Sequence, residues 1–266
     1  MFLLQFFSDY TILLWISLAT LAFIAGFLDA VVGGGGLIQI PALLINFPNL
    51  PLATIFGTNK IASFSGTSIS AYQYAKKIKF DYKLLAIISF FAFISSFSGA
   101  KIVSFLDVNK LKPIILIILI IIAFYTYNKK NLGAIQTKEL TKKKQIIYGS
   151  LIGFIIGFYD GFFGPGTGSF FVLAFVTILG LEFVTASAYS KIINCITNLS
   201  ALIVFINQKT YLINIAIIMA IFNMIGNFLG SKIALKKGNN FVRRIFLVVV
   251  SLMILRYGYD IFTHYF

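Results

Sequence analysis

Acidic residues are scarce in this sequence: eight of its 266 positions are Asp or Glu, and charged residues of both signs make up only 11%. A soluble domain carries charge at about a quarter of its positions. Hydrophobic residues fill 59% of the chain and the mean hydropathy is +0.94, so there is too little polar surface to cover a globule in water. The composition excludes a soluble enzyme and a nucleic-acid-binding module. It predicts an all-α polytopic membrane protein whose surroundings are the lipid bilayer.

Cysteine and early basic residues are also missing. Cys195 is the single cysteine, which excludes a secreted scaffold held by internal disulfides. No basic residue precedes Lys60, so the N-terminus lacks the charged n-region of a signal peptide. We therefore expect the apolar stretch from Thr11 to be retained as the first membrane span, with the N-terminus outside.

Basic residues are plentiful, with a net charge of +14, but they are grouped. Residues 128–145 hold six lysines against one acid, and residues 76–83 and 236–244 are basic as well, whereas residues 46–51 contain no basic residue. Lys and Arg collect in cytoplasmic loops of membrane proteins. The pattern predicts a cytoplasmic linker at 128–145, with 76–83 and 236–244 on the same side.

Ten apolar segments run along the chain, and two of them are too short to cross a bilayer as straight helices. Those two, 37–46 and 168–180, fall below the roughly 17 residues that a crossing needs, and we expect half-helices or re-entrant segments there. The sequence thus predicts 8–10 membrane segments. The full set is 11–32, 37–46, 52–75, 84–106, 113–127, 146–163, 168–180, 184–206, 211–235 and 241–258.

The two halves of the chain are copies of each other. A shift of 131 residues without gaps places Asp29 on Asp160 and Lys60 on Lys191, and aligns several glycines. Asp, Lys and Gly are scarce or costly in membrane spans, so their coincidence at one offset indicates duplication. We therefore divide the chain into a first repeat at 1–127, the linker at 128–145 and a second repeat at 146–266.

Charge predicts how the copies are oriented. The loop 76–83 is basic, whereas its equivalent, 207–214, carries a single lysine. An odd number of crossings per half, which gives an inverted repeat, explains this difference. Inverted repeats with broken helices are typical of secondary transporters, whose substrate lies at the repeat interface.

Glycine-rich segments follow the first span of each repeat and predict broken helices. The first contains Gly34, Gly35 and Gly36, and the second contains Gly166 and Thr167. Glycine costs a helix about 1 kcal/mol relative to alanine. An unwound stretch at membrane depth is tolerated where it faces a cavity or protein, and the N-terminus of the next helix attracts anions. The alternative is a tight turn whose glycines allow close helix packing.

Two lysines lie inside apolar spans at equivalent positions. Each costs about 2.5–3.5 kcal/mol on insertion scales, so Lys60 and Lys191 need a compensating interaction. An anion bound between them would supply it. Neighbouring side chains could donate hydrogen bonds to an oxyanion, namely Thr58, Asn59, Ser190 and Asn194. The alternative is that both lysines snorkel toward the headgroups.

Asp29 and Asp160 precede the two glycine breaks. One interpretation is proton-coupled transport, in which a carboxylate exchanges a proton during the cycle. The other is structural, with each aspartate accepting hydrogen bonds from the broken helix or pairing with Lys60 or Lys191. The sequence does not favour either.

These motifs resemble the sulfite exporter TauE/SafE family, also called toluene sulfonate uptake permeases, and in particular its YfcA-like bacterial members. The resemblance rests on GFLDAVVGGGGLIQIP at 26–41, TNK at 58–60, GFYDGFFGPGTGS at 157–169 and KIIN at 191–194. It implies a multi-pass protein of the bacterial inner membrane that moves small anions, often sulfur-containing ones. From the sequence we expect no cofactor, no metal and no nucleic-acid partner.

The leading hypothesis is a secondary transporter, an exporter or permease, that carries a small sulfur oxyanion or organosulfonate by alternating access. A passive anion channel is the second hypothesis. An intramembrane aspartyl protease with Asp29 and Asp160 as its dyad is a third, but the Gly-x-Gly-Asp motif of those proteases is absent.

Overall fold

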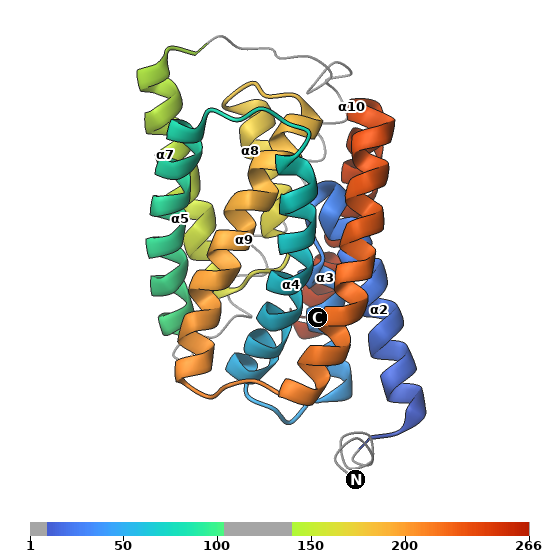
Figure 1. The fold of residues 1–266 in the computed structure, drawn as a ribbon. Helices are drawn as coiled ribbons and strands as arrows, with labels where there is room; N and C mark the ends of the chain where they lie inside the picture. Colours follow the sequence, from blue (N-terminus) through green and yellow to red (C-terminus); the bar gives the residue numbers. More distant parts are fainter. Residues whose placement is uncertain (1–9, 104–139, 266) are drawn as a thin grey trace.

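A computed structural model describes residues 10–103 and 140–265, and all regular structure in these ranges is helical (Figure 1). The predicted segment 113–127 and most of the predicted linker lie outside the described residues. The helices are α2 (Ile12–Val32), α3 (Gly36–Asn46), α4 (Leu52–Ala75), α5 (Tyr82–Ile102), α7 (Lys142–Phe162), α8 (Thr167–Thr177), α9 (Phe183–Asn207) and α10 (Ile213–Tyr265).

Five of these helices are long and apolar enough to cross a membrane: α2, α5, α7, α9 and the Ile213–Leu252 part of α10. Many of their large apolar side chains are exposed, as lipid-facing positions require. The short helices α3 and α8 have 11 residues each, which confirms the two predicted segments that cannot cross a bilayer alone. The expected class, an all-α polytopic membrane protein with broken helices, is confirmed.

Side chains next to the helix ends explain where several helices begin. Thr11 accepts a hydrogen bond from the first turn of α2, and Asp81 accepts two from the first turn of α5. Thr141 does the same for α7, which begins at Lys142, three residues before the predicted linker ends. These polar side chains satisfy backbone N–H groups that a helix leaves without partners.

α10 consists of two helices joined at a kink. Gly238 has φ 72° and ψ −165°, so the helix cannot continue through it. The kink separates the two segments that the sequence predicts at 211–235 and 241–258. Val184 donates its backbone N–H to the Asn239 side chain, which ties the kink to the start of α9.

The duplication extends to the helix boundaries. Shifting α3, α4 and α5 by 131 residues places their first residues on the first residues of α8, α9 and α10. In Figure 1, α4 rises from the bottom of the view to the top, whereas α9 descends. Equivalent helices thus run in opposite directions, which is compatible with the predicted inverted repeat.

Among the described helices, the first helix of each half packs against a helix of the other half. α2 packs on α10, and α5 packs on α7, while α4 and α9 meet at the centre (Figure 1). Glycines allow the close approach: Gly26 faces the backbone of Asn223, and its equivalent Gly157 faces the backbone of Ala92. Small residues at helix interfaces are a general device for close packing in membranes.

Basic residues gather at one end of the bundle. The turn between α4 and α5, the start of α7 and the Gly238 kink all lie at the top of Figure 1. These segments carry most of the described lysines and arginines. Their common position is what a single cytoplasmic face requires.

The glycine contacts predict a stability difference. Gly26→Ala and Gly157→Ala each place a Cβ against backbone of the neighbouring helix, and overpacking of this kind costs about 1–3 kcal/mol. Gly258→Ala is the control, because nothing lies within 4 Å of its added Cβ. We expect thermal unfolding in detergent to shift down for the first two variants only. Equal unfolding temperatures for all three variants would contradict this packing.

Candidate functional site: crossed lysine–aspartate pairs at the glycine breaks

Both glycine-rich segments interrupt a helix, as the sequence predicts. Three residues, 33–35, separate α2 from α3, and four residues, 163–166, separate α7 from α8. Positive φ angles, which side-chain-bearing residues rarely adopt, occur in both segments. They are 82° at Gly33, 113° at Gly34, 88° at Gly164 and 82° at Gly166.

The two breaks touch each other at the centre of the protein. A Cβ on Gly33 would overlap the backbone of Gly168, and a Cβ on Gly36 would lie 3.3 Å from the Cα of Pro165. Ser169 Oγ donates to the carbonyl oxygens of Val32 and Gly33, at 3.1 and 3.0 Å. The glycines therefore interrupt the helices and also allow close packing, so the two interpretations of these segments do not exclude each other.

Lys60 and Lys191 occupy the middle of the bundle. Each lies eight residues after the start of its helix, Lys60 in α4 and Lys191 in α9. Lys60 is 3% exposed and Lys191 is fully buried. Neither ammonium reaches the headgroups, so the snorkelling alternative is wrong.

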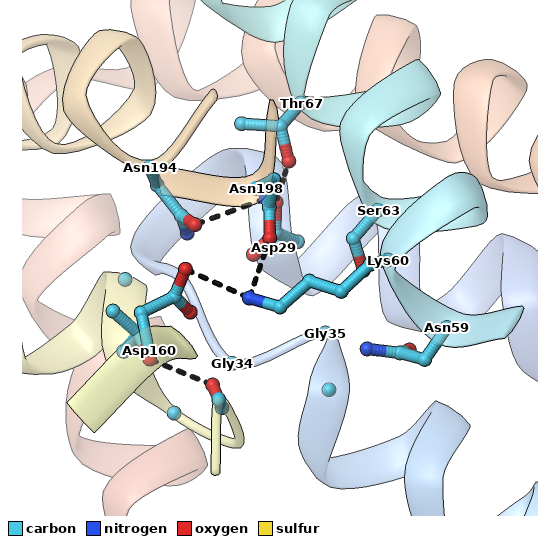
Figure 2. Close-up of a pocket in the computed structure, with 15 residues that line it drawn as sticks. Asp29, Gly34, Gly35, Asn59, Lys60, Ser63, Thr67, Asp160, Asn194 and Asn198 are labelled. Atoms are coloured by element: carbon cyan, nitrogen blue, oxygen red, sulfur yellow. Dashed lines mark hydrogen bonds and ion pairs between the residues drawn. The ribbon is translucent and has the colours of Figure 1, made fainter. Parts of the chain in front are cut away.

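Each lysine pairs with the aspartate of the opposite repeat. Lys60 Nζ lies 2.7 Å from Asp160 Oδ2, and Lys191 Nζ lies 3.1 Å from Asp29 Oδ2. The 131-residue shift converts one pair into the other. Figure 2 shows the Lys60 side chain extending between Asp160 and Asn198. The aspartates thus pair with lysines, which is the structural alternative that the sequence left open for them.

Two neutral residues complete the pairs, and the sequence reasoning missed both. Asn198 Oδ1 accepts from Lys60 Nζ at 2.9 Å, and Thr67 Oγ1 donates to Asp29 Oδ2 at 3.1 Å (Figure 2). Asn198 also donates to Asn194 Oδ1 at 3.0 Å. Thr67 and Asn198 are related by the same 131-residue shift and lie seven residues after Lys60 and Lys191. That spacing, two helical turns along one face, was the available signal.

A small polar cavity of about 20 Å³ lies between the breaks. This volume holds about one water molecule. Its walls come from both glycine breaks and from α4 and α9. Most of the residues that the sequence predicts for the site line it: Asp29, Gly34, Gly35, Gly36, Asn59, Lys60, Asp160, Gly166, Thr167 and Asn194.

Three predicted residues are placed around the cavity rather than at its wall. Thr58 Oγ1 accepts the backbone N–H of Leu212 at 2.9 Å, which joins α4 to the segment before α10. Ser190 Oγ donates to the carbonyl oxygen of Gly168 at 2.9 Å and so supports the second break. Lys191 reaches the site through its pair with Asp29.

The charges of the site balance. Lys60 and Lys191 carry two positive charges, and Asp29 and Asp160 carry two negative ones. Hydrogen bonding is incomplete, however. Within the described residues, Lys191 Nζ contacts Asp29 without hydrogen-bond geometry, and Asn59 Oδ1 has no hydrogen-bond partner. Buried polar groups are normally paired, so these two atoms have unused hydrogen-bonding capacity at the site.

Repeated halves, helices broken at the centre and buried charges between the halves are features typical of membrane transporters. The chain belongs to the sulfite exporter TauE/SafE family, whose model matches residues 18–257. Five apolar helices and this family fit a multi-pass protein of a bacterial inner membrane.

Individual relatives carry transporter names. A "Probable membrane transporter protein" of Haemophilus influenzae is 32% identical over 90% of this chain and 92% of its own. The "Probable membrane transporter protein YfcA" of Escherichia coli K12 is 34% identical over 90% of this chain and 87% of its own. Bacillus subtilis YdhB, with the same description, is 28% identical over 60% of this chain and 66% of its own. No solved structure matches.

The crossed pairs predict strong coupling between Lys60 and Asp160. Removing one partner leaves a buried charge without compensation, at a cost of about 3–5 kcal/mol, whereas removing both is close to neutral. We expect Lys60→Met and Asp160→Asn to lower the free energy of unfolding in a detergent–SDS titration, and the double variant to recover most of the loss.

Lys83→Met is the matched control, because Lys83 is exposed at the start of α5. Combined with Asp160→Asn, it should give additive effects. Additive effects for Lys60→Met and Asp160→Asn as well would mean that the pair contributes no coupling.

Proposed function

We propose that this protein is a secondary transporter of a small anion, a sulfur oxyanion or an organosulfonate, which works by alternating access. The observation that carries the proposal is the crossed arrangement of Lys60–Asp160 and Lys191–Asp29 around the cavity between the two glycine breaks. The family name, sulfite exporter, favours the sulfur-containing class.

The site offers an anion two kinds of attraction. The ammonium groups of Lys60 and Lys191 supply charge in an environment with little water. The first turns of α3 and α8 begin at the breaks, and helix N-termini favour negative charge. In the proposed bound state, the oxygens of the anion replace the carboxylate oxygens of Asp29 and Asp160 as partners of the lysines.

The cavity size supports a moving site rather than a fixed one. A space of about 20 Å³ holds neither a sulfite nor a sulfonate, so binding requires the walls to separate. Because each ion pair joins one repeat to the other, separation of the repeats breaks the pairs at the point where the anion binds. Movement of one repeat against the other is the general scheme of alternating access.

Charge balance connects anion binding to protons. The four charges sum to zero, so a monovalent anion leaves the buried site with one excess negative charge. Burying an uncompensated charge is costly. Protonation of Asp29 or Asp160 removes that excess and releases its lysine for the anion. We therefore propose transport of one proton with each monovalent anion.

A passive channel is less well supported. A channel needs a continuous water-filled path, whereas the described residues leave a water-sized space between two touching breaks. A proteolytic function is also less well supported. An aspartyl dyad shares one proton between two carboxylates. Here each carboxylate is paired with a lysine of the other repeat.

Replacing either lysine should abolish transport. In proteoliposomes tested with sulfite and a panel of sulfonates, we expect Lys60→Ala and Lys191→Ala to lose anion flux by more than ten-fold. The same anion should raise the thermal unfolding temperature of the purified wild-type protein and leave both variants unchanged.

Lys83→Ala, at the exposed start of α5, should keep both the flux and the stabilisation. The proposal fails if no anion of the panel is transported, or if the two central variants transport as well as Lys83→Ala. Flux that never saturates with concentration would favour the channel instead.

A proton gradient should drive accumulation. With one proton per monovalent anion, each pH unit of gradient supports about ten-fold accumulation at equilibrium. A sulfonate is the suitable substrate because its own charge does not titrate. Acidifying the outside should increase uptake, and Asp29→Asn and Asp160→Asn should remove this dependence. Equal accumulation with and without the gradient would exclude proton coupling.

A further inference from the structure

A wide basic groove lies between the C-terminal end of α4 and the part of α10 that precedes the Gly238 kink, away from the central cavity. Its volume is about 780 Å³. The segments that line it, the end of α4 and the part of α10 before the Gly238 kink, lie at the upper end of the bundle in Figure 1, where the basic segments gather. Four exposed lysines line it: Lys76, Lys77, Lys232 and Lys236.

The positive charge of the groove is not compensated by its walls. No Asp or Glu is among the described residues that line it. Lys232 and Lys236 are four residues apart on one helix, a spacing at which like charges repel. Lys76 Nζ lies 4.2 Å from the centroid of the Tyr72 ring, which holds this ammonium near the groove. An anion in the groove would relieve the repulsion among the four lysines.

The charge is specific to this end of the protein. Shifting by 131 residues places Lys76 and Lys77 on Asn207 and Gln208, at the opposite end of the bundle. Lys232 falls on Lys101, but Lys236 falls on Phe105. Three of the four lysines therefore have no basic counterpart in the other repeat, and the duplication does not account for the groove.

The groove also has an apolar part. Ile69, Phe228 and Leu235 line it together with the lysines. Phe228 and Tyr72 are 48% and 60% exposed. A volume of about 780 Å³ far exceeds that of a small oxyanion. Cationic heads beside apolar walls match a ligand with an anionic headgroup and acyl chains.

We propose that this groove binds an anionic phospholipid of the cytoplasmic leaflet, with its phosphate among Lys76, Lys77, Lys232 and Lys236. Basic pockets between membrane helices on that side suit such headgroups. The acyl chains lie along Phe228 and Leu235. Because α10 also packs on α2, the lipid contacts a helix that joins the two repeats. This proposal is independent of the transported substrate.

The test uses the full chain in a neutral detergent. Phosphatidylglycerol, phosphatidylcholine and soluble glycerol phosphate are added separately, and bound lipid is counted by native mass spectrometry alongside thermal unfolding. The test variant carries Lys76→Gln, Lys77→Gln, Lys232→Gln and Lys236→Gln. The control carries Lys83→Gln, Lys142→Gln, Lys143→Gln and Lys144→Gln, which removes four exposed charges outside the groove.

We expect phosphatidylglycerol to bind and stabilise the wild type and the control. The test variant should lose affinity for this lipid by about five-fold for each groove lysine removed. Phosphatidylcholine should have no such effect. Equal loss in both variants would show a general charge effect and overturn the proposal, as would full stabilisation by glycerol phosphate.

If the variant with four substitutions does not fold, the same lipid binding is measured on the double variant Lys232→Gln and Lys236→Gln. If the folded double variant retains as much phosphatidylglycerol as the wild type, the proposal is overturned, and reduced retention supports it.

Discussion

Two lysine charges are buried at the centre of this protein, and each is neutralised by an aspartate from the other repeat. A charge in a low-dielectric interior needs a partner, so neither repeat can bury its own lysine alone. The Lys60–Asp160 and Lys191–Asp29 pairs therefore join the halves at the place where both first helices are broken. Separation of the halves at this place would break these pairs.

The remaining architecture fits this constraint. A positive-φ glycine follows each aspartate by four residues, Gly33 after Asp29 and Gly164 after Asp160, so the carboxylates stand in the last turns of α2 and α7, next to the breaks. Crossed packing of α2 on α10 and of α5 on α7 holds each aspartate near the opposite half. Thr67 and Asn198 add neutral hydrogen bonds, one to each pair. The result is a neutral centre with little space around it.

The sequence predicted the class, the helix breaks and the repeat, because glycine conformation and membrane hydropathy act locally. It also identified Asp29, Lys60, Asp160 and Lys191, since charges inside spans are rare. It did not choose between a coupling role and pairing for the aspartates, because the crossing of partners depends on how the halves pack. Thr58 and Ser190 show the same limit: their hydroxyls have suitable chemistry, but packing directs them to backbone atoms of Leu212 and Gly168.

The central claim is that an anion takes the place of a carboxylate at the lysines. Proton uptake during anion binding tests it most directly, measured by the pH change of a weakly buffered solution of the purified protein after addition of a sulfonate. The account predicts uptake of about one proton for each monovalent anion bound, and neither binding nor uptake by Lys60→Ala. Saturable sulfonate binding without proton uptake would contradict it.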